Sequence, residues 1–137
     1  MITNMSNLSL LDAAGTPVAH SFTPASRVAE NTARWVEKPA SGALLGAKVL
    51  TLSIKEPSDP IAGVYRIKVT FAVPKMDNSV PTAPKILSIG RVNCEFLVPA
   101  GFTTQEAKDL VKMFEQSLTL GTSTQIGDNI ADRSLPY

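Results

Sequence analysis

The strongest constraint on the fold is a period of two in the middle of the chain. In residues 48–56, KVLTLSIKE, apolar side chains recur at every second position, and residues 64–73, VYRIKVTFAV, repeat the pattern. This period places successive side chains on opposite faces of a β-strand. The segment between the two stretches, PSDPIAG, is rich in turn-forming residues. The two stretches therefore predict an antiparallel hairpin with one apolar face and one polar face.

Weaker strand patterns flank this hairpin. Residues 8–11 and 18–22 predict an amino-terminal hairpin, and residues 34–37 predict a strand that points Trp35 into the core. Residues 89–98, IGRVNCEFLV, predict a further strand with Val92, Cys94 and Phe96 on its apolar face. Between the last two strands, residues 74–88 contain three prolines and are expected to form a long loop.

After Pro99 the period changes from two to 3.6, which predicts helices. Thr103 and Glu106 are spaced as a capping box at the start of a helix that Gly121 would end. Leu110 and Phe114 belong to its apolar stripe. A shorter helix is predicted over residues 124–132. The expected fold class is α+β in one domain, residues 1–137, with a hairpin over 1–23, a sheet over 33–98 and helices over 103–133.

The polar face of the predicted sheet carries cations and hydrogen-bonding groups. The alternation assigns to it Thr51, Ser53, Lys55, Arg66, Lys68, Thr70, Arg91, Asn93 and Glu95. Residues 27–91 contain ten Lys/Arg and five Asp/Glu, although the net charge of the whole chain is only +1. A local excess of cations favours a polyanionic partner, whereas the pattern by itself is also typical of a solvated sheet face.

Catalytic chemistry finds little support in the sequence. The chain has one histidine and one cysteine, so a cysteine-rich metal site and an intrachain disulfide are excluded. His20 is predicted to be a surface turn residue, and Cys94 a small buried apolar side chain. We recognise no phosphate-binding glycine loop and no nucleophile–base pair. The sequence predicts no enzyme, no cofactor, no metal, no membrane partner and no small-molecule substrate.

The order of motifs resembles that of one viral family. Residues 51–55 read T-x-S-x-K, residues 65–69 read Y-x-I-K-V, and V-P-K, N-x-E, the amphipathic helix and a final tyrosine follow. From Trp35 to Tyr137 this order is similar to that of the coat proteins of single-stranded RNA bacteriophages, the levivirus type. The resemblance implies an amino-terminal hairpin, a five-stranded antiparallel sheet and two carboxy-terminal helices. It also implies an interlocked homodimer with a continuous ten-stranded sheet.

The resemblance implies a function as well. Coat dimers assemble in the bacterial host cytoplasm into a T=3 icosahedral shell, the capsid of the virion, around the single-stranded genomic RNA. The inward sheet face also binds an RNA stem-loop, which represses translation and directs packaging. The dimer interface implied is Val92, Cys94, Phe96, Leu110 and Phe114. The loop implied between dimers contains Lys75, Met76, Asp77, Asn78, Pro81 and Pro84.

The RNA-binding residues implied are Thr32, Thr51, Ser53, Lys55, Arg66, Lys68, Arg91, Asn93 and Glu95. Lys55, Arg66, Lys68 and Arg91 neutralise phosphates in this interpretation. Thr51, Ser53 and Lys68 match the family's pocket for an unpaired base, with Thr32 at its edge. Arg91 replaces a tyrosine that stacks on a base in several relatives, and a guanidinium can both stack and pair with phosphate.

Two other functions fit the same residues. A small dimeric regulator could use the polar face to bind RNA without forming a shell. A dimeric scaffold could lack an RNA partner altogether. The three prolines of the expected loop favour assembly over the regulator, and the basic middle segment argues against the scaffold.

Overall fold

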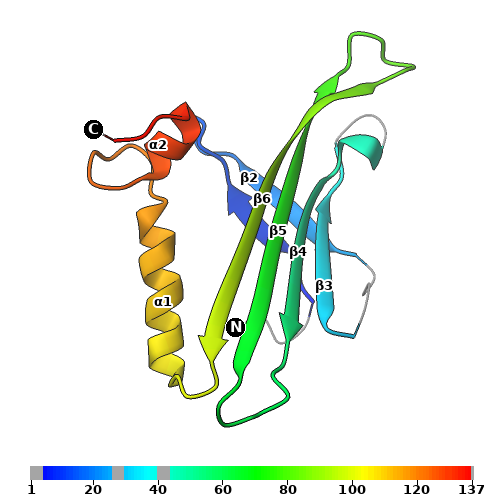
Figure 1. Ribbon diagram of the computed structural model, residues 1–137. Coiled ribbons are helices and arrows are strands. Elements are labelled where there is room, and N and C mark those ends of the chain that lie inside the picture. The colour runs from blue at the N-terminus through cyan, green and yellow to red at the C-terminus, as the bar shows by residue number, and fades with distance from the viewer. Residues whose placement is uncertain (1–4, 26–29, 40–43, 137) are drawn as a thin grey trace.

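A computed structural model describes residues 5–25, 30–39 and 44–136 (Figure 1). Its strands are β1 (Leu8–Leu11), β2 (Ala19–Pro24), β3 (Thr32–Glu37), β4 (Lys48–Lys55), β5 (Val64–Asp77) and β6 (Lys85–Pro99). A 3₁₀ turn, η1 (Leu44–Gly46), precedes β4, and the helices α1 (Thr104–Ser117) and α2 (Gly127–Asp132) end the chain. The prediction of antiparallel strands followed by two carboxy-terminal helices is confirmed.

The strands form one antiparallel sheet in the order β1-β2-β3-β4-β5-β6. The expected hairpin is present, but it is continuous with the sheet instead of separate from it, so that the strand count is six. Strand β2 takes part in both pairings, because residues 19–22 pair with β1 while Thr23 and Pro24 pair with β3. One strand thus connects the amino-terminal hairpin to the remaining four strands, β3 to β6.

The long loop expected over residues 74–88 is wrong in its bounds. Strand β5 continues to Asp77 and pairs through a bulge at Lys75/Met76 until Asp77 lies opposite Lys85. The prediction assumed that each proline would interrupt a strand, but Pro74 lies within β5. Pro74 lies beyond Ala72, the last residue of β5 that pairs with β4, so its missing N–H breaks no pairing on that side, a position where strands tolerate proline. Only residues 78–84 connect the two strands.

The amino-terminal hairpin packs on the apolar face of the sheet. Phe22, which is only 1% exposed, lies against Phe71 with ring centroids 5.8 Å apart. Trp35 is 5% exposed, as predicted for a core residue, and its Nε1 donates a hydrogen bond of 3.0 Å to the carbonyl of Ser6. These two aromatic residues are the buried apolar side chains of the described part of the chain, which is a small core for 137 residues.

Helix α1 begins as predicted and ends earlier than predicted. The Thr103 side chain accepts a hydrogen bond from the backbone of Glu106, and the Glu106 side chain accepts one from the Thr103 backbone, which completes the capping box. The last helical residue is Ser117, and Gly121, the expected stop, lies in the following loop with φ 75°. Figure 1 shows α1 standing beside the sheet instead of covering it, and α1 has no buried residue.

No helix in the described ranges is long and apolar enough to cross a membrane.

Candidate functional site

Strand register brings the predicted polar residues onto one face of the sheet. Cross-strand partners share a face, and one row across β3, β4, β5 and β6 consists of Thr32, Ser53, Lys68 and Glu95. The turn between β4 and β5 fixes this register. In this turn, Gly63 lies so close to Pro57 and Asp59 that an added Cβ would collide with the Pro57 side chain and the Asp59 carbonyl. The alternation read from the sequence is therefore reproduced in three dimensions.

Two neighbouring rows extend the face. The next row contains Arg34, Thr51, Thr70 and Asn93. On the other side of the first row, Lys55 lies opposite Arg66. We call the face made by these rows, together with Arg91, the polar platform. Arg91 lies opposite Ala72, two rows from Lys68 on the same face, so it does not contact the group around Lys68 and instead extends the platform toward the loop.

A hollow in the platform is lined by three of its cations. Its volume is about 420 Å³, and it is lined by Asn31, Ser53, Lys55, Arg66 and Lys68. Four of these five residues were singled out from the sequence. The position of Asn31 follows from a backbone hydrogen bond of 3.0 Å, in which the N–H of Ile54 donates to the Asn31 carbonyl. No sequence pattern marked Asn31, because it precedes the alternating residues of β3.

Arg34 is the other platform residue that the sequence prediction missed. It pairs with Thr51 and is exposed. A signal for it existed, since Arg34 precedes the buried Trp35 and must therefore point to the opposite face. With Arg34, the platform carries five cationic side chains against one carboxylate, Glu95.

Glu95 neutralises only part of this positive charge. Its Oε1 lies 3.7 Å from Nη1 of Arg66, and the two side chains are 37% and 62% exposed. An ion pair this long and this exposed contributes little to stability and is readily exchanged for another partner. Thr51 and Ser53 are half-buried beside these charges, so their hydroxyls are within reach of a molecule that lies on the platform. The arrangement can bind phosphates and hydrogen-bond a flat polar group.

The opposite face of β6 carries apolar side chains that were assigned to a dimer interface. Phe96 contacts Phe114 of α1 edge to face, with ring centroids 5.6 Å apart. Val92 and Phe114 are nevertheless 54% and 41% exposed, while Cys94 and Leu110 are half-buried. The chain by itself therefore leaves this apolar surface largely uncovered.

Comparison with protein families identifies the chain. The family model described as "Levivirus coat protein" matches residues 3–137. The chain belongs to the levivirus coat protein family. Members of this family are structural proteins of viral particles and not enzymes. No curated protein sequence matches the chain.

Solved structures of phage particles share the fold of this coat protein. The virus-like particle of bacteriophage ESE058 has a TM-score of 0.84 at 21% identity, covering 98% of this chain and 99% of the other. That of bacteriophage NT-214 has a TM-score of 0.81 at 24% identity, covering 98% and 100%. A third structure, described as an unassembled virus coat protein dimer and bacteriophage RNA-binding dimer, has a TM-score of 0.68 at 17% identity, covering 97% and 98%.

The residues of the coat protein that were assigned to a loop between dimers divide into two groups. Lys75, Met76 and Asp77 lie in β5 and not in a loop, because the β5–β6 ladder continues past Pro74. Asn78, Pro81 and Pro84 lie in the connection of residues 78–84. The Asp77 carboxylate accepts a 2.9 Å hydrogen bond from the N–H of Ser79, so the strand end and the connection are joined.

Proposed function

We propose that this coat protein forms homodimers that assemble into an icosahedral shell around single-stranded RNA, with the polar platform facing the RNA. The observation that carries the RNA-binding part is the in-register polar platform, with five cations on one sheet face. Membership of the coat protein family supports the shell. A related structure described as an RNA-binding dimer supports the choice of partner.

The dimer is proposed to form through β6. This strand is the last in the sheet order, and 14 of its 15 residues, all but Leu87, are paired to β5 on one side only. A long unpaired edge beside exposed apolar side chains favours pairing with another chain. A two-fold axis that pairs β6 with its own copy would join β2 to β6 of each chain into ten strands. Val92, Cys94, Phe96, Leu110 and Phe114 would then be covered by the partner.

RNA is proposed to bind in two ways. Lys55, Arg66 and Lys68 around the hollow, with Arg91 further along, attract phosphates and release counterions. Between them, the hydroxyls of Thr51 and Ser53 hold the edge of an unpaired base, since RNA is recognised through splayed, unstacked bases.

Three further residues complete this RNA site: Thr32 at the edge of the base pocket, and Asn93 and Glu95 on β6. A site of this kind would bind a stem-loop of the genome, repress translation and direct packaging during assembly in the host cytoplasm.

Electron microscopy of the protein expressed alone in bacteria tests the shell, and the absorbance of the particles at 260 and 280 nm tests the RNA. Uniform closed particles that contain RNA are expected. Dimers that bind RNA but form no particles would favour a small RNA-binding regulator. Particles without nucleic acid at low salt would refute the role of the platform while leaving the shell intact.

A further inference from the structure

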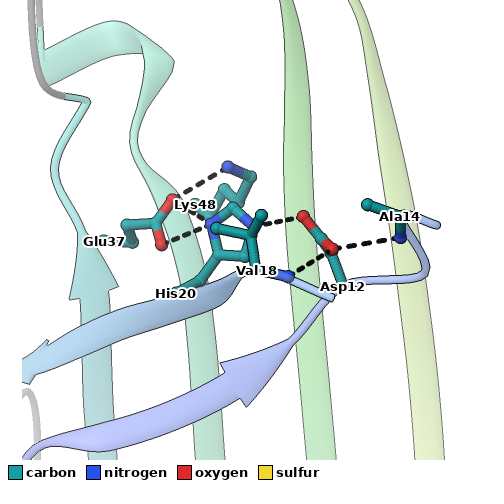
Figure 2. Close-up of polar contacts among 6 residues, drawn as sticks. All are labelled: Asp12, Ala14, Val18, His20, Glu37 and Lys48. Atoms are coloured by element: carbon teal, nitrogen blue, oxygen red, sulfur yellow. Dashed lines mark hydrogen bonds and ion pairs between the residues drawn. The ribbon is translucent and has the colours of Figure 1, made fainter. Parts of the chain in front are cut away.

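A histidine between two carboxylates connects the amino-terminal hairpin to the sheet. His20 lies in β2, with its Nε2 2.9 Å from Oδ2 of Asp12 and its Nδ1 2.8 Å from Oε2 of Glu37. Figure 2 shows the carboxylates on opposite sides of the ring. Lys48 of β4 lies 2.9 Å from the other oxygen of Glu37. The prediction that His20 is a surface turn residue is therefore wrong, since the ring is held from two sides.

The turn that follows β1 fixes the Asp12 carboxylate in place. Its Oδ1 accepts hydrogen bonds of 3.1 Å from the N–H of Ala14 and 3.0 Å from the N–H of Val18. Asp12 can therefore not swing away from His20 without breaking the turn (Figure 2). The carboxylate oxygens face different ring nitrogens and do not converge on one point, and no metal-binding group of three or more His, Cys, Asp or Glu residues is found in the described ranges.

This geometry fits a doubly protonated ring. A neutral imidazole has one N–H, so one of its nitrogens would present a lone pair to a carboxylate oxygen. The imidazolium form donates from both nitrogens. It also balances the charges, because two carboxylates then face two cations, His20 and Lys48. These are the charged groups that the turn, β2, β3 and β4 bring to the ring.

The pKa values follow the same geometry. The hydrogen bond with Asp12 raises the pKa of His20 above 6.5, against the effect of desolvation, and the charge of Glu37 adds to the rise. The backbone N–H of Val18, with His20, lowers the pKa of Asp12 to about 2. Burial acts to raise the pKa of Glu37, but Lys48 and His20 outweigh it, so that the pKa is lowered from 4.5.

We propose that protonated His20 is a pH-sensitive latch that holds the amino-terminal hairpin on the sheet. In the described part of the chain, the backbone connection between β2 and β3 is short: it consists of the pairs Thr23↔Val36 and Pro24↔Trp35 and a hydrogen bond of 2.8 Å from the N–H of Ala25 to the Arg34 carbonyl. A group whose pKa is raised in the folded state stabilises it fully below the unfolded pKa. That contribution is lost as the pH rises through the folded pKa. The latch is therefore closed at acidic pH and opens as the pH rises through the folded-state pKa of His20, which lies above 6.5.

Hydrogen–deuterium exchange of the full-length protein, read by mass spectrometry on peptides that cover β1 and β2, tests the latch. Wild type is compared with His20→Gln at the same pH, so intrinsic exchange and all other titrating groups cancel in the ratio of exchange rates. Exchange in the variant should be about threefold faster at pH 6, in keeping with charge pairs that are partly exposed. The ratio should approach one at pH 9.

A second variant, His20→Arg, keeps a cation between the carboxylates at every pH used. Relative to this variant, the wild-type hairpin should exchange increasingly fast as the pH rises from 6 to 9. This comparison applies even when His20→Gln folds poorly. Asp59→Asn, in the distant β4–β5 turn, is the control and should leave the ratio unchanged. Ratios that do not change with pH for either His20 variant would overturn the proposal.

Discussion

The replacement Lys68→Ala removes the cation at the centre of the polar platform. Lys68 lies between Ser53 and Glu95 in the first row and lines the hollow with Lys55 and Arg66. Its side chain is exposed, so the change creates no cavity and should leave the fold and the assembly intact. The effect should appear in RNA binding, and above all in the dependence of the affinity on salt.

The size of the effect follows from counterion release. For single strands, the slope of log K against log salt changes by about 0.7 for each phosphate contact. When the salt concentration rises from 50 to 200 mM, the affinity of wild type should fall by a factor about 2.6 times larger than the affinity of Lys68→Ala, because the variant has lost one contact. Truncation also leaves Glu95 without the cation directly opposite it, so the repulsion between Glu95 and phosphates increases. Binding should weaken at every salt concentration, and most at low salt.

Filter binding of a labelled single-stranded RNA to unassembled dimers, at several salt concentrations, measures both quantities. Lys108→Ala is the matched control, because it removes the same charge from an exposed position on α1. Wild type and Lys108→Ala should give the same slope, and Lys68→Ala a shallower one. Equal slopes and equal affinities for all three proteins would show that RNA does not lie on this face.

Three other changes test the core, the helix cap and the connection between β5 and β6. Phe22→Ala should lower the free energy of unfolding by about 3–5 kcal/mol in chemical denaturation, since Phe22 is 1% exposed, whereas Leu11→Ala, at a 70% exposed residue, should cost far less. Thr103→Ala should lower the free energy of unfolding by about 1 kcal/mol, because the capping box is lost, and Thr104→Ala should lower it much less. Equal decreases for the two variants would contradict a stabilising role of the Thr103 cap. Deletion of residues 79–82 should leave dimers in sedimentation but alter particle size or closure in micrographs, and normal particles would separate this connection from assembly.

The polar platform was predictable because a period of two needs only local information. The side of the sheet taken by Ser53 and Lys68 follows from their own neighbours in the chain, and an error of one residue would have reversed both faces. The length of the β5–β6 ladder was not predictable in this way. Whether Pro74 breaks a strand depends on which neighbouring strand is present at that level, and β4 ends its pairing with β5 at Ala72.

The surroundings of His20 were hidden for a related reason. Its partners Asp12 and Glu37 are 8 and 17 positions away in the sequence, and Lys48, which pairs with Glu37, is 28 positions away. The β1–β2 hairpin brings Asp12 to His20, and the β3–β4 pairing sets Lys48 opposite Glu37. The packing of the hairpin against the end of β3 then joins the two pairs. The residues next to His20 in the sequence therefore carry no sign of the carboxylates that it contacts.

One partner chain can both pair with the free edge of β6 and cover the exposed apolar stripe of α1. Val111 of this stripe and Leu118, the residue that follows the last helical residue, are 49% and 40% exposed. This exposure is costly for apolar side chains at a helix without a buried residue. A second copy placed by a two-fold axis perpendicular to the sheet would pair the β6 edges and bring each helix over the other chain. The same operation keeps both polar platforms on one side, so a bound RNA would meet the cations of two chains. Stable folding and the doubled binding surface would then depend on the same interface. A stable species of 14.6 kDa in sedimentation at micromolar concentration would contradict this dependence.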